Sequence, residues 1–291
     1  MVDGRVWLLA GLAVLSGIYS GETLARSHLS RTASGTPALR SNAVYVLDET
    51  NAAVVLSRQS DVAMPIASIT KLMTALVVLE AGQPLDEQIQ ITDEDRGGTK
   101  STASRLEVGT SLSRADLLHL ALMASENRAA HALGRSYPGG LPACIEAMNA
   151  KARALGMKST HFVEPTGLSS DNVASSEDLA RLVLAAAQSP TIQEYSTDKR
   201  YAVPVRRHQV EFHNTDSLVQ NPTWNIIVQK TGYIAEAGRC LVMKAIFEGR
   251  SVVIVLLDSA GKYTRVADAR RIRKWLESRL AANAGTVLGK A

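Results

Sequence analysis

Three short groups of residues in this chain could together carry out nucleophilic catalysis. The first is an S-x-x-K formed by Ser68 and Lys71. Three positions apart on a helix, the two side chains lie on the same face, one turn apart. A serine hydroxyl is a weak nucleophile until a base takes its proton, and a lysine withdrawn from water can be neutral enough to do so. The pair could therefore form an acyl-enzyme, and a helix N-terminus would stabilise negative charge on Ser68.

The S-x-x-K pattern alone is weak, because it also occurs at positions 196–199 and 259–262. Both of these matches lie in polar stretches and are interpreted as surface serines near surface lysines. Only Ser68 opens an apolar segment, residues 68–81, which predicts a helix inside the protein. Gly82 and Pro84 would end it.

The second group is an S-x-N formed by Ser125 and Asn127, at the end of the apolar helical stretch over residues 117–130. A second hydroxyl can relay a proton to a leaving group, and an amide side chain can orient the substrate or the lysine. A competing match, S-D-N at residues 170–172, is interpreted as a loop of ordinary turn residues.

The third group, Lys230, Thr231 and Gly232, ends a predicted strand over residues 224–229. A lysine and a threonine at that position can hold a carboxylate, and glycine lets a substrate backbone approach closely.

The elements that must position these groups predict an α+β fold. A hairpin is expected over residues 43–56, and helices over 68–81, 114–134, 141–155, 176–188 and 266–280. Strands are expected over 225–229, 239–247 and 251–258. Strands joined by tight turns are antiparallel. We therefore expect one antiparallel sheet flanked by helices, with the first hairpin joining the late strands. A helical lobe over about 85–190 would lie beside the sheet, with the site in the cleft between them.

The N-terminus has the pattern of an export signal. Residues 6–19 are an apolar run of 14, too short to span a membrane but typical of a signal peptide. The expected division is a signal peptide over 1–25, a linker over 26–40, a serine peptidase domain over 41–280 and a disordered tail over 281–291. This predicts a periplasmic protein, with an uncleaved N-terminal membrane anchor as the alternative.

Composition excludes several classes of protein. The net charge is only +4 and no run of five like charges appears, so no nucleic acid is expected as a partner. A hydrophobic share of 46% excludes disorder for most of the chain. The only two cysteines, Cys144 and Cys240, cannot make a disulfide framework or a four-ligand zinc site. They are interpreted as buried and unpaired, with a bridge as the alternative.

Taken together and in this order, the motifs resemble those of the penicillin-binding proteins and serine β-lactamases. Four longer segments are similar to the short D-alanyl-D-alanine endopeptidases of the penicillin-binding protein 7 type. These segments are PIASITKLMTALVVLEAGQPLDE, LLHLALMASENRAAHALGRSYPGG, AMNAKARALGMKSTHFVEPTGLS and WNIIVQKTGYIAEAGRCLVM. The resemblance covers about residues 41–278.

This resemblance implies the roles of the catalytic residues. Ser68 would attack the carbonyl of a D-Ala peptide bond and Lys71 would take its proton. Ser125 and Asn127 would complete the proton network and hold the substrate.

The same resemblance assigns the binding residues. Lys230 would share in the proton network, Thr231 would contact the substrate carboxylate, and Gly232 would shape the strand edge. The backbone N–H groups of Ser68 and Tyr233 would form the oxyanion hole. No metal or organic cofactor is implied, and no H-E-x-x-H occurs in the sequence.

The resemblance implies a peptidoglycan D,D-endopeptidase that cuts D-Ala–diaminopimelate cross-links and is inhibited covalently by β-lactams. The alternatives are a D-alanyl-D-alanine carboxypeptidase that trims pentapeptides and a β-lactam-binding sensor. Glu164 begins an E-x-x-x-N pattern like that of class A β-lactamases, but Leu168 replaces its Asn, so rapid β-lactam hydrolysis is not expected. Gly232 lies near the end of the chain, so the appended β-domain of many carboxypeptidases is expected to be absent.

Overall fold

The computed structural model describes residues 35–96 and 104–288. They belong to one compact unit, Ala33–Ala291. The expected signal peptide, residues 1–25, lies outside the described residues, as does most of the expected linker. Within the described ranges, no helix is both long and apolar enough to cross a membrane.

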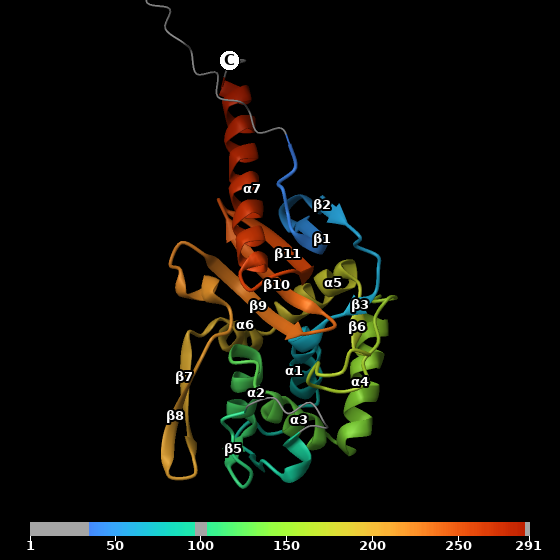
Figure 1. The fold of residues 1–291 in the computed structure, drawn as a ribbon, viewed down its shortest axis with the longest axis vertical. Coiled ribbons are helices and arrows are strands. Elements are labelled where there is room, and N and C mark those ends of the chain that lie inside the picture. The colour runs from blue at the N-terminus through green and yellow to red at the C-terminus, as the bar shows by residue number, and fades with distance from the viewer. Residues whose placement is uncertain (1–34, 97–103, 289–291) are drawn as a thin grey trace, which may run out of the picture. The chain divides into compact units, whose positions relative to one another are not determined.

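The centre of the unit is a five-stranded antiparallel sheet in the order β2-β1-β11-β10-β9. Its strands are β1 (Ser41–Asp48), β2 (Ala53–Arg58), β9 (Asn225–Ile234), β10 (Gly238–Phe247) and β11 (Arg250–Ser259). The first hairpin therefore joins the late strands, and the α+β architecture predicted from the sequence is confirmed. Strand β9 lies at one edge of the sheet (Figure 1), so no further described strand pairs with its outer side. The backbone N–H of Gln229 in β9 donates to Ser196 Oγ at 3.4 Å.

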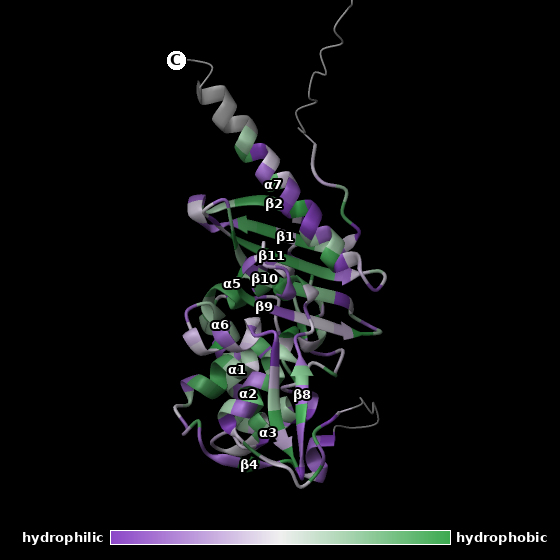
Figure 2. Ribbon diagram, turned by 90° about the vertical axis from the view of Figure 1, so that its left-hand side faces the viewer, coloured by the Kyte–Doolittle hydropathy of each residue, from purple (hydrophilic) through white to green (hydrophobic). Residues whose placement is uncertain are grey.

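Both faces of this sheet are covered. Side chains alternate along a strand, and in β11 Val252 and Ile254 pack with Ala269 and Ile272 of α7 (Thr264–Leu288). Val253 belongs to the larger core formed with the helices on the other face. Figure 2 shows the resulting hydrophobic strands between the two layers. Helix α7 continues to Leu288, so the prediction of a disordered tail from residue 281 is wrong for the part of that segment described here.

The lobe is made mainly of helices (Figure 1). Their bounds are α1 Thr70–Glu80, α2 Arg114–Met123, α3 Asn127–Arg135, α4 Gly140–Ala154, α5 Ser176–Ala186 and α6 Pro190–Thr197. The prediction of one helix over 114–134 is wrong, because the chain breaks at Ser125, where φ is +59°. Glu126 then starts α3 by accepting a hydrogen bond from the backbone N–H of Arg128.

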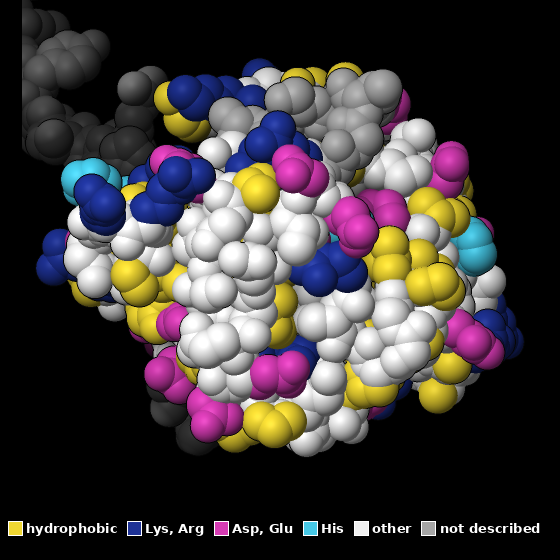
Figure 3. Space-filling view, turned by 90° about the horizontal axis from the view of Figure 1, so that it is seen from below, with side chains coloured by type: hydrophobic (Ala, Val, Ile, Leu, Met, Phe, Trp, Pro, Cys, Tyr) yellow, Lys and Arg dark blue, Asp and Glu magenta, His cyan; other side chains and the backbone are white. Residues whose placement is uncertain are grey.

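Short elements complete the fold. Three strand pairs are β3 (Met64–Pro65) with β6 (Val173–Ala174), β4 (Gln88–Gln90) with β5 (Ser111–Ser113), and β7 (Arg200–Val205) with β8 (His208–His213). Single 3₁₀ turns are η1 Glu49–Asn51, η2 Ala67–Ile69, η3 Asp93–Arg96 and η4 Ser217–Gln220. The β7–β8 hairpin was not predicted from the sequence. From below, cationic and anionic side chains are interspersed over the described part of the lobe (Figure 3), a pattern typical of a solvated surface.

Candidate active site

Ser68 lies in η2, directly before α1, at the N-terminal end of a buried helix. Ile69, Leu72 and Met73 are fully buried around it, which is why the apolar segment fixes this helix inside the lobe. The preceding Ala67 has a φ of +49°, a left-handed conformation that is uncommon for a residue with a Cβ. Such backbone strain clusters at functional sites, where the surrounding structure maintains it.

Lys71 is fully buried one turn after Ser68. Its Nζ lies 2.9 Å from Ser68 Oγ, 2.7 Å from Asn127 Oδ1 and 2.5 Å from the carbonyl oxygen of Thr166. Burial lowers the pKa of Lys71 from its ordinary value to about 8, although Glu164 and Glu126 act in the opposite direction. About a tenth of the amine is therefore neutral at pH 7.

These contacts suit a neutral amine as well as an ammonium group. A neutral lysine has two N–H donors and one lone pair. The amide oxygen of Asn127 and the carbonyl oxygen of Thr166 can accept from the two donors. The lone pair then faces Ser68 Oγ, at a distance suitable for proton transfer.

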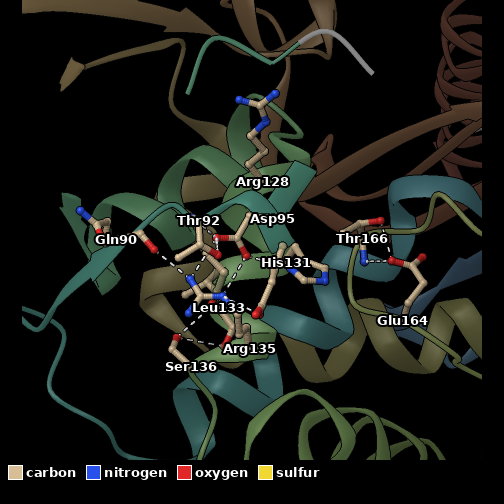
Figure 4. Close-up of polar contacts among 12 residues, drawn as sticks. Gln90, Thr92, Asp95, Arg128, His131, Leu133, Arg135, Ser136, Glu164 and Thr166 are labelled. Atoms are coloured by element: carbon tan, nitrogen blue, oxygen red, sulfur yellow. Dashed lines mark hydrogen bonds and ion pairs between the residues drawn. The ribbon is translucent and has the colours of Figure 1, made fainter. Parts of the chain in front are cut away.

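Glu164 holds the loop that supplies the Thr166 carbonyl. Its carboxylate accepts hydrogen bonds from the backbone N–H and hydroxyl of Thr166 at 2.6 and 2.5 Å, and from the N–H of Gly167 at 2.6 Å. The Nδ2 of Asn172 donates to it at 2.8 Å. Figure 4 shows Glu164 turned back onto Thr166. The carboxylate is therefore engaged by its own loop, which fixes an acceptor for Lys71.

Asn172 corrects one interpretation of the sequence. It lies in a loop, as expected, but it is fully buried and is not an ordinary turn residue. Its Nδ2 also donates to Thr70 Oγ1 at 3.2 Å and to the Glu164 carbonyl at 2.9 Å, and its Oδ1 accepts from Val163 N–H at 2.7 Å. The competing S-D-N match thus connects the Glu164 loop to α1.

Two glycines lie against the backbone of Ser68. A Cβ added to Gly167, where φ is +81°, would overlap the Ala67 carbonyl and lie 2.8 Å from Ser68 N. A Cβ on Gly232 would lie 3.1 Å from the same nitrogen. Since real Cβ contacts under 3.0 Å essentially never occur, Gly167 cannot be replaced without a backbone shift. Gly232 brings β9 next to the candidate nucleophile.

Ser125 and Asn127 flank the break between α2 and α3. The first residue of α3, Asn127, contacts Lys71 directly, whereas Ser125 lies two residues earlier with a strained φ of +59°. The structure thus unites Ser68, Lys71 and Asn127 by direct contacts.

A buried carboxylate secures the helix that begins with Asn127. Asp95 of η3 accepts from His131 Nδ1 at 2.8 Å and from Arg135 at 2.9 and 3.1 Å, and it also accepts from Thr92 N–H at 2.8 Å. These interactions hold the pKa of Asp95 at about 2, despite burial, which alone would raise it. Asn127, His131 and Arg135 are four residues apart, so they lie on one face of α3. Figure 4 shows His131 and Arg135 turned toward Asp95. Asp95 therefore holds the helix face whose first turn contacts Lys71.

The K-T-G residues lie inside β9, which runs to Ile234, so the prediction that they end the strand is wrong. Gly232 pairs with Cys240 of β10, and this pairing extends the strand beyond Gln229. Lys230 is fully buried, and burial together with the charges of Lys71 and Arg265 holds its pKa well below the ordinary value.

The hydroxyl of Thr231 lies 2.5 Å from that of Thr215, and Tyr233 is 56% exposed. The side chains of β9 thus change from buried to exposed within a few residues.

Arg265 is a candidate binding residue that sequence reasoning missed. It lies in α7, and its Nη1 donates to the carbonyl oxygen of Gly232 at 3.0 Å. Burial lowers its pKa from the ordinary value, while the carboxylate of Asp216 raises it. A lone arginine at the start of an amphipathic helix carries no motif, so only the folded chain reveals that it reaches β9.

The other S-x-x-K matches do not form such pairs. Ser196 and Ser259 are buried, which corrects their interpretation as surface serines, but Lys199 and Lys262 are exposed. Cys144 and Cys240 are buried and free, as interpreted. Among the described residues, no group of three or more His, Cys, Asp or Glu is arranged to hold a metal ion.

The chain is similar to known proteins over most of its length. The family model for peptidase S11, D-alanyl-D-alanine carboxypeptidase, matches residues 30–261. The D-alanyl-D-alanine endopeptidase of Pseudomonas aeruginosa is 49% identical over 242 residues, which cover 82% of this chain and 78% of the relative. The Escherichia coli endopeptidase is 42% identical over 278 residues, covering 94% and 89%.

The fold has a solved counterpart in the Streptomyces K15 DD-transpeptidase. Its crystal structure superposes with a TM-score of 0.77 at 25% sequence identity, covering 83% of this chain and 98% of that one. The family resemblance and the fold class expected from the sequence are thus confirmed. The chain belongs to the peptidase S11 family of D-alanyl-D-alanine carboxypeptidases.

Proposed function

We propose that the chain is a serine D,D-endopeptidase that cleaves D-Ala–diaminopimelate cross-links in peptidoglycan. One observation carries the proposed chemistry: the buried Nζ of Lys71, with a pKa of about 8, lies 2.9 Å from Ser68 Oγ. A base with a pKa near the working pH is well suited to proton transfer. The two endopeptidase relatives, each similar over most of the chain, favour a cross-link as the substrate.

In the proposed acylation, Ser68 Oγ attacks the D-Ala carbonyl carbon while its proton passes to Lys71 Nζ. The tetrahedral intermediate then collapses and the C–N bond breaks. The leaving amine takes the proton from Lys71 Nζ, relayed by Ser125, and departs with the second peptide, which leaves Lys71 neutral again. Water hydrolyses the resulting ester, which releases a carboxylate and restores the Ser68 hydroxyl. Asn127 and the Thr166 carbonyl hold Lys71 in place throughout.

Strand β9 is the proposed binding element. Its open edge can pair with an extended peptide, and Gly232 lets that peptide lie next to Ser68. The N–H groups of Ser68 and Tyr233 would stabilise the oxyanion. Thr231 would hold the carboxylate beside the scissile bond, and the cation of Arg265 next to Gly232 supports this assignment. Lys230 adds a second buried amine to the proton network.

β-Lactams should acylate Ser68 by the same route, and the acyl-enzyme should hydrolyse slowly. Glu164, whose place in the sequence is suggestive of a class A β-lactamase, is engaged by its own loop instead. It is therefore a poor candidate for activating a hydrolytic water.

Carboxypeptidase activity is the second candidate, because the matching family model is described by that activity. The two reactions share the acyl-enzyme and differ only in the leaving group.

Peptidoglycan as the substrate class places the site of action outside the cytoplasm. We further propose export by a signal peptide over residues 1–25, followed by a linker over 26–40 and the peptidase domain from residue 41.

The test is to incubate the purified protein with cross-linked muropeptide dimers and, separately, with pentapeptide monomers, and to identify the products by mass. Conversion of dimers to monomers with little loss of terminal D-Ala supports the endopeptidase. Loss of D-Ala alone would replace it with the carboxypeptidase. Unchanged substrates, with fluorescent penicillin still bound to Ser68, would support the sensor instead. Ser68→Ala is the control for enzyme-independent turnover.

A further inference from the structure

The exposed end of β9 carries an arginine–tyrosine pair that the proposed chemistry does not use. Tyr233 and Arg239 are directly opposite each other in the β9–β10 ladder. The Arg239 guanidinium lies 4.4 Å from the centre of the Tyr233 ring, in a cation–π contact. Thr231 and Tyr233 are two residues apart, so they share one face of the strand.

The guanidinium of Arg239 is not engaged by a described carboxylate. It makes no hydrogen bond or ion pair with another described residue, and it is only partly buried. Arg265 is close enough for the charge of Arg239 to help lower its pKa. The nearby carboxylate of Asp216 is buried, and its own pKa is raised. This end of β9 therefore has two arginines, Arg265 and Arg239, and the planar donor of Arg239 is held over an exposed ring. Two carboxylates lie in the same region, that of Glu236 in the β9–β10 turn and that of Asp258 beside Gly238.

The position of the pair relates it to one part of the proposed substrate. If Thr231 holds the carboxylate beside the scissile bond, a pentapeptide ends there. A cross-linked substrate continues past that point into the second peptide stem, which bears further carboxylates. Beyond Gly232, the first exposed side chain along β9 is Tyr233, and Arg239 lies over it. Guanidinium groups bind carboxylates in paired hydrogen bonds, which suits them to this recognition.

We propose that Arg239, held over Tyr233, is a binding site for a carboxylate of the second peptide stem, and so favours cross-linked dimers over pentapeptides. This inference rests on the proposed function, because it names the part of the cross-linked substrate that the same site binds. Arg239 would act by recognition and take no part in proton transfer.

The matched variants are Arg239→Ala and Arg279→Ala. Arg279 also lies over an aromatic ring, 4.8 Å from the centre of Trp275, but on α7. The two substitutions therefore remove the same charge and the same type of contact. The measurement is kcat/KM for dimer cleavage divided by the rate constant for fluorescent-penicillin acylation, since penicillin has no second stem. Arg239→Ala should lower this ratio about five- to tenfold, and Arg279→Ala should leave it unchanged.

A binding measurement decides the inference even if dimers are not turned over. The Kd for an intact dimer is measured by calorimetry in Ser68→Ala and in Ser68→Ala with Arg239→Ala. The second protein should bind the dimer five- to tenfold more weakly and a monomeric tetrapeptide equally well. Equal dimer affinities, or equal losses for dimer and monomer, would overturn the inference. Wild-type protein that binds dimers in this way but does not cleave them would refute the proposed function alone.

Discussion

The buried and the exposed parts of the candidate active site differ in how their positively charged side chains are held. At the buried end, Lys71 contacts three acceptors and Lys230 has no exposed surface. At the exposed end, Arg239 lies over Tyr233 and has no acceptor among the described residues. A buried amine is shifted in pKa and fixed in place, which suits proton transfer. A partly exposed guanidinium is available to bind a ligand. The buried amines therefore suit catalysis, and the arginine at the exposed end of β9 suits substrate recognition.

The largest expected effect tests the buried end. Ser68→Ala should abolish covalent labelling by fluorescent penicillin and lower turnover of every substrate by on the order of 10⁶, as loss of a nucleophile does in other serine peptidases. Ser259→Ala, from an S-x-x-K match without a paired lysine, is the control and should still be labelled. Persistent labelling of Ser68→Ala would remove Ser68 from its proposed role.

Lys71→Ala should slow acylation by about 10³- to 10⁴-fold at neutral pH, because the proton of Ser68 loses its acceptor. Lys199→Ala removes an exposed lysine of another S-x-x-K match and should leave the rate unchanged. The measurement is the second-order rate constant with fluorescent penicillin from pH 6 to 10. Recovery of most of the rate at high pH without Lys71 would contradict its role as the base.

Glu164→Ala should slow acylation by about 10²-fold. Without the Glu164 carboxylate, the loop no longer fixes the Thr166 carbonyl, and a small displacement of Lys71 from Ser68 lowers the rate strongly. Deacylation of bound penicillin, followed by release of label, should not slow further. A variant that acylates normally and deacylates slowly would show instead that Glu164 activates water.

Asp95→Asn should slow acylation about tenfold, because a loosened α3 no longer holds Asn127 against Lys71. Asp268→Asn is the matched control, because Asp268 is also a buried carboxylate but lies in α7. It accepts hydrogen bonds from the backbone N–H groups of Arg40 and Ser41 at 2.9 and 2.8 Å. Both variants should lower the melting temperature, but only Asp95→Asn should lower the acylation rate of the folded protein. Equal effects on that rate would make Asp95 merely structural.

The sequence predicted the elements and the chemically active residues better than it predicted what holds them. Ser68 and Lys71 are neighbours on one helix, so their pairing follows from local geometry. The Thr166 carbonyl reaches Lys71 across 95 residues of sequence, and a backbone oxygen has no residue type to reveal it. Asn172 resembled a turn residue because only tertiary packing buries it.

The predicted ends of two elements, one helix and one strand, were wrong because a single residue in each sets the boundary. The positive φ of Ser125 interrupts an otherwise continuous helical pattern, and the pairing of Gly232 with Cys240 extends β9 through a sequence typical of a turn. Arg265 was missed because its position beside Gly232 depends on how α7 packs against the sheet. For Gly232, pairing with the neighbouring strand overrides the local pattern, and for Arg265 a contact between distant segments decides its position.

The most direct test of the central claim is the pH dependence of acylation in the wild-type protein. If neutral Lys71 is the base and its pKa is about 8, the acylation rate should rise about tenfold per pH unit from pH 6 and level off above pH 8. The second-order rate constant for fluorescent penicillin gives this profile directly, with thermal melts at each pH to show that the protein stays folded. A rate that does not change between pH 6 and 9, or a midpoint near the ordinary lysine pKa of about 10.4, would contradict the account.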